Sequence, residues 1–91
     1  MPVFVVVATR EAARIGEQIE AVIDQSARLE LTNDSWLIDF DGTTRELSEK
    51  LKIRTQSPVG AGIAFPITNF SGRGSANIWE WLKLHMPTRT D

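Results

Sequence analysis

The chain has 91 residues, of which 42% are hydrophobic and 24% are charged, and its net charge is −2 at neutral pH. This length predicts a single domain over residues 1–91, and the balance excludes a disordered chain and general attraction to nucleic acid by net charge. The absence of cysteine excludes disulfides, thiolate metal sites and cysteine nucleophiles. No apolar run is long enough to cross a bilayer and no basic segment precedes the first one, so we expect a cytoplasmic protein without membrane contact.

The chain begins with a β-branched and aromatic run, Met1–Ala8, which predicts a strand buried on both faces in the middle of a sheet. In the next segment, roughly Arg10–Gln25, apolar residues recur every three or four positions, as they do in an amphipathic helix. The carboxyl end of such a strand is where α/β folds often place catalytic groups. Ala8 and Thr9 stand there, so this junction offers neither a carboxylate nor a histidine.

Two segments of alternating polar and apolar residues follow, 28–32 and 35–40, with Asn33-Asp34 between them. This pattern predicts a β-hairpin, because asparagine and aspartate tolerate the positive φ of a tight primed turn. In the second strand, the alternation places Trp36 and the other large apolar residues on one face and Asp39 on the opposite face.

The second half of the chain predicts a helix, a strand and another helix. Thr43 and Glu46 have the spacing of a capping box, which opens the second helix. Residues 59–67 predict a fourth strand, and its two glycines and Pro66 favour a place at the edge of the sheet. Ser75 is suited to cap a short final helix that carries two tryptophans.

The order of these elements, β-α-β-β-α-β with an additional C-terminal helix, indicates an α+β fold. Right-handed crossovers make the ferredoxin-like sandwich the simplest arrangement, with two helices packed on a four-stranded antiparallel sheet. This topology places the first and third strands at the centre of the sheet. They are the two most apolar strands of the chain.

Four stretches spread over most of the chain carry a family resemblance: FVVVA at 4–8, DSWLI at 34–38, TTRELSEKL at 43–51 and WEWL at 79–82. With them the chain resembles the small ferredoxin-like proteins related to the second CRISPR-associated protein, and most closely their stand-alone bacterial SinR-like branch. The resemblance implies the fold and a dimer. In nuclease-like members the first strand ends in an aspartate that holds a divalent metal across a dimer. Here Ala8-Thr9 occupies that place, which argues against nuclease activity.

Asp39 and Asp41 are the candidate catalytic or metal-binding carboxylates, because hard oxygen ligands hold magnesium where they converge with a third group such as Asp34. The simpler interpretation is that both are solvated charges on an open sheet face and that Asp34 is a turn residue. We therefore expect no catalytic residue, metal or cofactor, and keep Asp39 and Asp41 as the alternative.

Two groups of residues are candidates for binding anions. The first is the loop that runs into the last helix, where backbone amides and a guanidinium attract phosphate, and it consists of Ser71, Gly72, Arg73, Gly74 and Ser75. The second consists of basic residues that could touch nucleic acid, namely Arg10, Lys50, Lys52 and Arg54. The alternatives are a flexible connector for the loop and a solvated helix end for the basic residues.

The last predicted helix carries His85, Trp79 and Trp81. We expect the lone histidine to stabilise the helix end or to be exposed, since it has no matched nucleophile and orienting acid. The tryptophans are two positions apart and cannot share one helical face. One is expected in the core and the other exposed or buried in a partner, which makes them interface candidates.

These observations favour one function and leave another open. The favoured hypothesis is a non-catalytic interaction or regulatory module that forms a homodimer through an edge strand and can take a further protein partner. The alternative is nucleic-acid binding or metal-dependent nuclease activity of the CRISPR-associated type. The acidic balance and the missing strand-end carboxylate rank the first hypothesis ahead.

Overall fold

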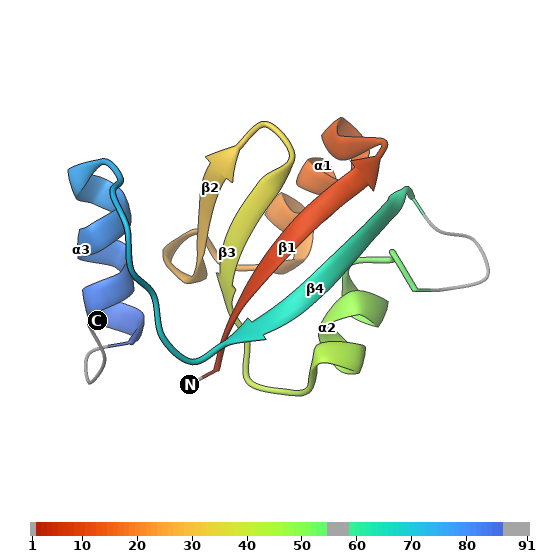
Figure 1. Cartoon of the computed structure of the whole chain (residues 1–91). Helices are drawn as coiled ribbons and strands as arrows, with labels where there is room; N and C mark the ends of the chain where they lie inside the picture. The colour runs from red at the N-terminus through yellow and green to blue at the C-terminus, as the bar shows by residue number, and fades with distance from the viewer. Residues whose placement is uncertain (1, 55–58, 87–91) are drawn as a thin grey trace.

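The computed structural model describes residues 2–54 and 59–86. Figure 1 shows the elements in chain order: β1 (Val3–Arg10), α1 (Ala12–Val22), the 3-10 turn η1 (Gln25–Ala27), β2 (Arg28–Thr32), β3 (Ser35–Asp39), α2 (Thr44–Lys50), β4 (Ala61–Ile67) and α3 (Ala76–His85). None of the helices in the described part of the chain is long and apolar enough to span a membrane.

The strands form one four-stranded antiparallel sheet in the order β2-β3-β1-β4. The predicted α+β class is therefore confirmed, as are the central places of β1 and β3 and the edge position of β4. In the register across the sheet, Val5 lies between Leu37 of β3 and Phe65 of β4. Directly opposite residues share a face, so these three side chains are on one side of the sheet.

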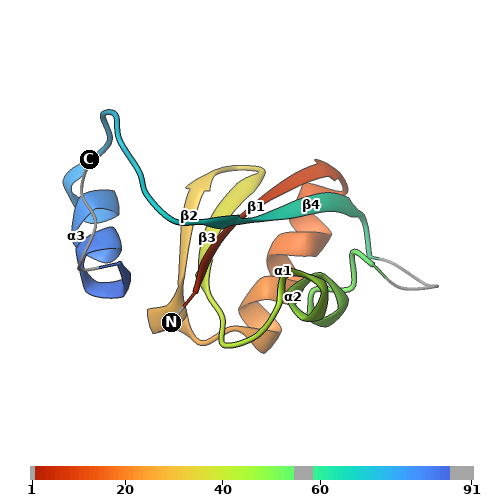
Figure 2. The same ribbon diagram turned by 60° about the horizontal axis from the view of Figure 1, so that its bottom comes forward.

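Helices α1 and α2 cover the other side of the sheet, as Figure 2 shows. The side chains between the sheet and these helices form the larger core, and its members are all apolar: Phe4, Val6, Ala8, Ile15, Ile19, Ile23, Trp36, Ile38, Leu47 and Leu51. The alternation in β3 places Trp36 and Ile38 on one face, as the sequence predicts, and this is the face that the helices cover.

Helix α3 packs on the opposite face, next to β2 and β3, and both views place it beside β2 (Figures 1 and 2). Here Trp81 and Leu82 bury Val3 and Leu37 in a second, smaller core. The helix covers only part of this face. Among the described residues, Ile63 and Phe65 of β4 are left 53% and 44% exposed.

The first helix is shorter than predicted at both ends. β1 continues to Arg10, and Glu11 turns the chain with a left-handed φ of 60°, so α1 begins only at Ala12. At the other end the helix stops at Val22 because the next residue is extended. Asp24 then accepts the Ser26 amide and starts η1.

The hairpin forms as predicted, but its turn is of another kind. Asn33 and Asp34 do not have positive φ, which outside glycine occurs only at Glu11 and Lys52 in the described residues. The Thr32 hydroxyl instead donates to the Asp34 carboxylate (2.8 Å), and the register shifts before Thr32. This side-chain contact stabilises the turn without the strained backbone of a primed turn.

The predicted capping box at the start of α2 is confirmed. The Glu46 amide donates to the Thr43 hydroxyl (3.1 Å), and the Thr43 amide donates to the Glu46 carboxylate (2.8 Å). Two amides that the helix cannot satisfy thus find acceptors, which helps to stabilise a helix of only seven residues.

Candidate functional site

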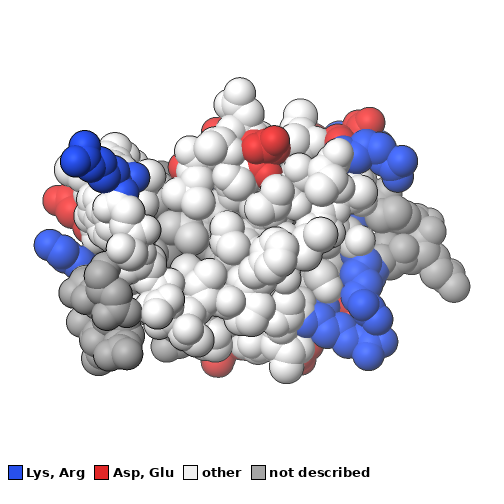
Figure 3. Space-filling view, viewed as in Figure 1, with Lys and Arg blue, Asp and Glu red and all other residues white. Residues whose placement is uncertain are grey.

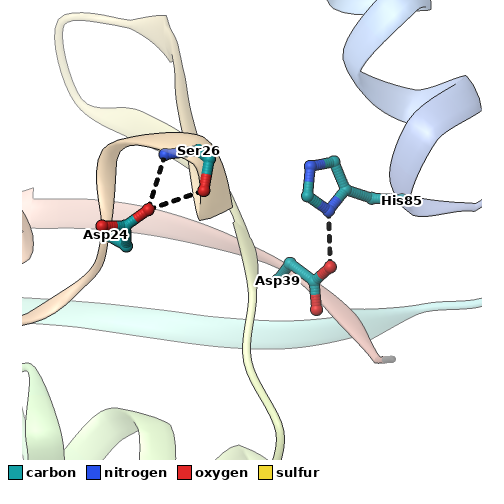
Figure 4. A network of polar contacts seen from close by, with 4 residues as sticks. All are labelled: Asp24, Ser26, Asp39 and His85. Atoms are coloured by element: carbon teal, nitrogen blue, oxygen red, sulfur yellow. Dashed lines mark hydrogen bonds and ion pairs between the residues drawn. The ribbon is translucent and has the colours of Figure 1, made fainter.

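The end of α3 meets the end of β3 through a carboxylate and an imidazole. Nδ1 of His85 lies 2.5 Å from Oδ2 of Asp39, and the two side chains are only 18% and 7% exposed (Figure 4). Asp39 lies two positions after Leu37 in β3, so both side chains are on the face that α3 covers. His85 follows Trp81 by one helical turn, which places it on the side of α3 that packs on the sheet. His85 does lie in the last turn of α3, where the helix-end alternative places it, but the predicted solvated charge at Asp39 and the exposed alternative for His85 are wrong. The reason is that α3 docks where an open face was expected.

Trp81 completes this contact. Its ring stacks on the His85 ring with centroids 4.0 Å apart and planes inclined by 23°. Two buried polar atoms, Oδ1 of Asp39 and Nε1 of Trp81, have no hydrogen-bond partner within the described residues. Burying such atoms costs free energy, so the α3 contact combines apolar burial with a polar penalty.

The Asp39–His85 pair resembles the acid and base of a catalytic triad, but a triad also needs a nucleophile. In residues 2–54 and 59–86, no serine or threonine hydroxyl forms a hydrogen bond with His85. The observed contact of the pair is the one that joins α3 to the sheet.

The other carboxylates do not converge with Asp39. Asp41 is exposed and lies beyond the end of β3, while Asp34 is in the hairpin turn at the start of that strand. Over the described part of the chain, no three acidic or histidine side chains are close enough to hold a metal ion. The metal alternative for Asp39 and Asp41 thus has no geometric support.

The basic candidates separate into different places. Arg10 is exposed at the end of β1, opposite Ala61 of β4. Lys50 and Lys52 are exposed at the end of α2, where the Lys50 carbonyl accepts from the side-chain amide of Gln18 at 3.0 Å. Arg54 alone among the four lines a groove between α2 and β4.

This groove, which we call the α2–β4 groove, has a volume of about 460 Å³ and is lined by Thr44, Arg45, Ser48, Ile53, Arg54, Gly62, Ile63 and Ala64. It brings together two guanidinium groups, two hydroxyl groups and several aliphatic side chains. Arg45 is a residue that the sequence interpretation did not single out. Arg45 and Ser48 are about one helical turn apart, and this spacing indicates that they share a face of α2. Nothing in the sequence shows that Arg54 lines the same groove.

Arg54 reaches the groove because the chain reverses after α2. Lys52 adopts a left-handed φ of 60°, and its amide donates to the Glu49 carbonyl (3.0 Å). The amides of Ile53 and Arg54 then both donate to the Ser48 carbonyl, at 3.1 and 3.2 Å. A left-handed residue that ends a helix in this way is usually glycine, so a lysine in that place gives no sequence signal.

The predicted anion loop lies before α3, and its residues from Ser71 to Ser75 are all exposed. Helix α3 does begin directly after Ser75, as predicted, but the Ser75 side chain caps no amide of the helix. Its hydroxyl donates to the Asn77 side chain instead. Gly72, with φ of 135°, allows the bend of the loop.

The two tryptophans of α3 do face differently, but neither is an exposed anchor. Trp81 is buried in the second core, and Trp79 is half-buried against Phe70 with ring centroids 5.5 Å apart. The large exposed apolar side chains of the described chain are Ile63, Phe65 and Leu84. The alternation in β4 was a signal for the first two, since its large residues alternate with small ones that face the helices.

A second carboxylate contact, between Asp24 and Ser26, lies at the surface before β2 (Figure 4). The Ser26 hydroxyl donates to Oδ2 of Asp24 at 2.6 Å and the Ser26 amide donates at 3.2 Å. These hydrogen bonds lower the pKa of Asp24 below its usual value of 3.8, because they favour the charged carboxylate.

No protein-family model matches this chain, and no curated protein matches it either.

Proposed function

We propose that the chain is a non-catalytic interaction module of ferredoxin-like topology, which associates with a second copy of itself through β4. The strand order β2-β3-β1-β4 and the two helices on one face support this topology.

The observation that carries the self-association is the exposure of Ile63 and Phe65 on an edge strand, at 53% and 44%. Across the sheet they lie opposite Val7 and Val5, which are only half-buried, so the four side chains form one apolar strip. Figure 3 shows mostly uncharged atoms in the middle of this face, whereas lysine and arginine gather toward its sides. An apolar strip beside an open strand edge is a common protein-binding surface.

A second copy fits this surface by symmetry. Two β4 edges that pair antiparallel about a two-fold axis would continue the sheet and place Phe65 of each copy on the same face. Gly62 and Pro66 restrict the register, since proline donates no backbone hydrogen bond and glycine offers no side chain to pack. Pairing along one seven-residue strand buries a modest area, so we expect a dimer that dissociates on dilution.

The test is light scattering after size-exclusion chromatography over a range of protein concentrations. Wild type is expected to shift from monomer to dimer as the concentration rises, and Phe65→Lys is expected to stay monomeric because it places a charge in the apolar strip. Leu84→Lys is the matched control: Leu84 is 78% exposed but lies on α3, so this variant should dimerise like wild type.

A wild-type protein that stays monomeric at its solubility limit would contradict the proposal. Equal association of the Phe65→Lys and wild-type proteins would also contradict it, because the contact would then lie elsewhere.

Nuclease chemistry is not the function that the geometry supports. One oxygen of Asp39 is taken by His85, and its other oxygen is buried under α3. Asp41 lies outside the strand and is exposed. A pair of metal-binding carboxylates on this sheet face would require α3 to leave it.

A further inference from the structure

The α2–β4 groove shares Ile63 with the apolar strip, but the proposed self-association uses none of the charged or polar groups of the groove. Its volume of about 460 Å³ is in the range of sites for small organic ligands. Arg45 and Arg54 supply positive charge from two separate segments, and the Thr44 hydroxyl adds a polar group. Ile53 and Ala64 contribute aliphatic surface. A ligand that fits this lining carries a negative charge at one end and an apolar body at the other.

The charged residues that line the groove are both positive. None of the described residues that line it is an aspartate or a glutamate. Arg45 forms an ion pair with Glu49 on the same helix, but the distance is 3.7 Å and both side chains are at least half exposed. Such a pair contributes little stability, so an anion in the groove can replace it at low cost. Guanidinium groups bind phosphate through paired, charge-assisted hydrogen bonds.

Hydrogen bonds hold the main chains of Arg45 and Arg54 close to the same residue, Ser48. Arg45 is on α2, and the Ser48 hydroxyl donates to its carbonyl at 2.9 Å. Arg54 is tied to the same turn of helix through its amide, which donates to the Ser48 carbonyl. The left-handed Lys52 makes this return possible. The backbones of both arginines are therefore tied to one helical turn, and little backbone ordering remains to be done when a ligand binds.

We propose that the α2–β4 groove binds a small phosphorylated molecule of nucleotide size. Its phosphate lies between Arg45 and Arg54, and its apolar part lies against Ile53 and Ala64. This site is distinct from the predicted anion loop at residues 71–75, and it goes beyond the self-association proposed for β4.

Isothermal titration calorimetry at low salt tests this proposal with three probes: adenosine diphosphate, pyrophosphate and adenosine. We expect adenosine diphosphate to bind most tightly and pyrophosphate more weakly, because only the first also uses the aliphatic wall. Adenosine, without phosphate, is expected to show no binding. The double variant Arg45→Gln/Arg54→Gln should weaken adenosine diphosphate binding by at least about tenfold.

Arg73→Gln is the control, because it removes an exposed guanidinium from the loop before α3 and leaves the groove intact. It should bind adenosine diphosphate like wild type. Both groove arginines are exposed, so the double variant should keep the wild-type circular dichroism spectrum and melting temperature.

Three results would overturn the proposal: no binding of either phosphate probe, unchanged affinity in the Arg45→Gln/Arg54→Gln variant, or a loss of binding confined to Arg73→Gln. If neither phosphate probe binds but a single-stranded RNA oligonucleotide does, the first of these results has a specific cause. The basic residues would then act as a surface for a polyanion rather than as a small-molecule groove.

Discussion

The two faces of the sheet are built by different rules. The face under α1 and α2 is sealed by apolar side chains alone, and Val6, Ile15, Ile38 and Leu47 have no exposed surface. The opposite face is divided. Helix α3 covers its β2–β3 half through a small core and a buried Asp39–His85 contact, while the β4 half keeps its apolar side chains exposed.

The two faces therefore differ in what they contribute: the closed face contributes stability, and the divided face offers surface for binding. A closed apolar core needs only the right pattern and volume of side chains, and it offers nothing for a partner to bind. The divided face carries polar atoms without partners and apolar residues without cover. Such features cost stability and are common at sites of interaction.

Neighbouring residues of β3 give the largest test of this contrast. Ile38 is buried under α1 and α2, and Leu37 is buried under α3. We expect Ile38→Ala to lower the free energy of unfolding by about 4 kcal/mol and Leu37→Ala by about 2 kcal/mol, because a helix docked by few contacts can shift to fill a cavity. Urea denaturation measures both. Equal losses would show that the two faces are packed equally well.

The Asp39–His85 contact gives a test of intermediate size. His85→Ala leaves a buried carboxylate without a partner, so we expect a loss of about 2 kcal/mol in the free energy of unfolding. Faster hydrogen exchange at the amides of α3, with the amides of α1 unchanged, should accompany it.

Two further variants check the cause of that loss. Asp39→Asn combined with His85→Ala should recover part of the stability, because no unpaired charge remains. Lys83→Ala, at an exposed position of the same helix, should change the stability by less than about 0.5 kcal/mol. If the double variant is no more stable than His85→Ala, the cost does not come from the buried carboxylate.

The smallest expected effect concerns Asp24, the exposed counterpart of Asp39. Its pKa lies below 3.8 because the Ser26 hydroxyl and amide donate to the charged carboxylate. A lowered pKa in the folded state adds stability that is present above pH 3.8 and lost as the pH falls through the lowered value.

An NMR titration of Asp24 measures this effect directly. Ser26→Ala should raise its pKa toward 3.8, whereas Ser48→Ala removes a hydroxyl far along the chain and should leave the titration unchanged. A pKa that does not respond to Ser26→Ala would mean that the side-chain hydrogen bond has no effect in solution.

Much of the fold could be predicted because its signals are local. The β-branched run of β1, the Thr43–Glu46 capping box and the Pro66-containing edge strand each depend on neighbouring residues. The alternation that buries Trp36 also needs no knowledge of the rest of the chain. The candidate site was less predictable. Arg54 was a candidate, but its place beside Arg45 depends on a left-handed lysine that no sequence rule anticipates.

By itself, the sequence determined the order of the elements, the division of the β3 side chains between the two faces of the sheet, and the edge position of β4. Periodicity, capping and the limits of proline act over a few residues, and this is why they can be read directly. Only the tertiary structure decided where α3 docks. That docking joins Asp39 to His85 across 46 positions of the chain, turns an expected surface charge into a buried contact, and leaves Ile63 and Phe65 as the exposed part of the same face.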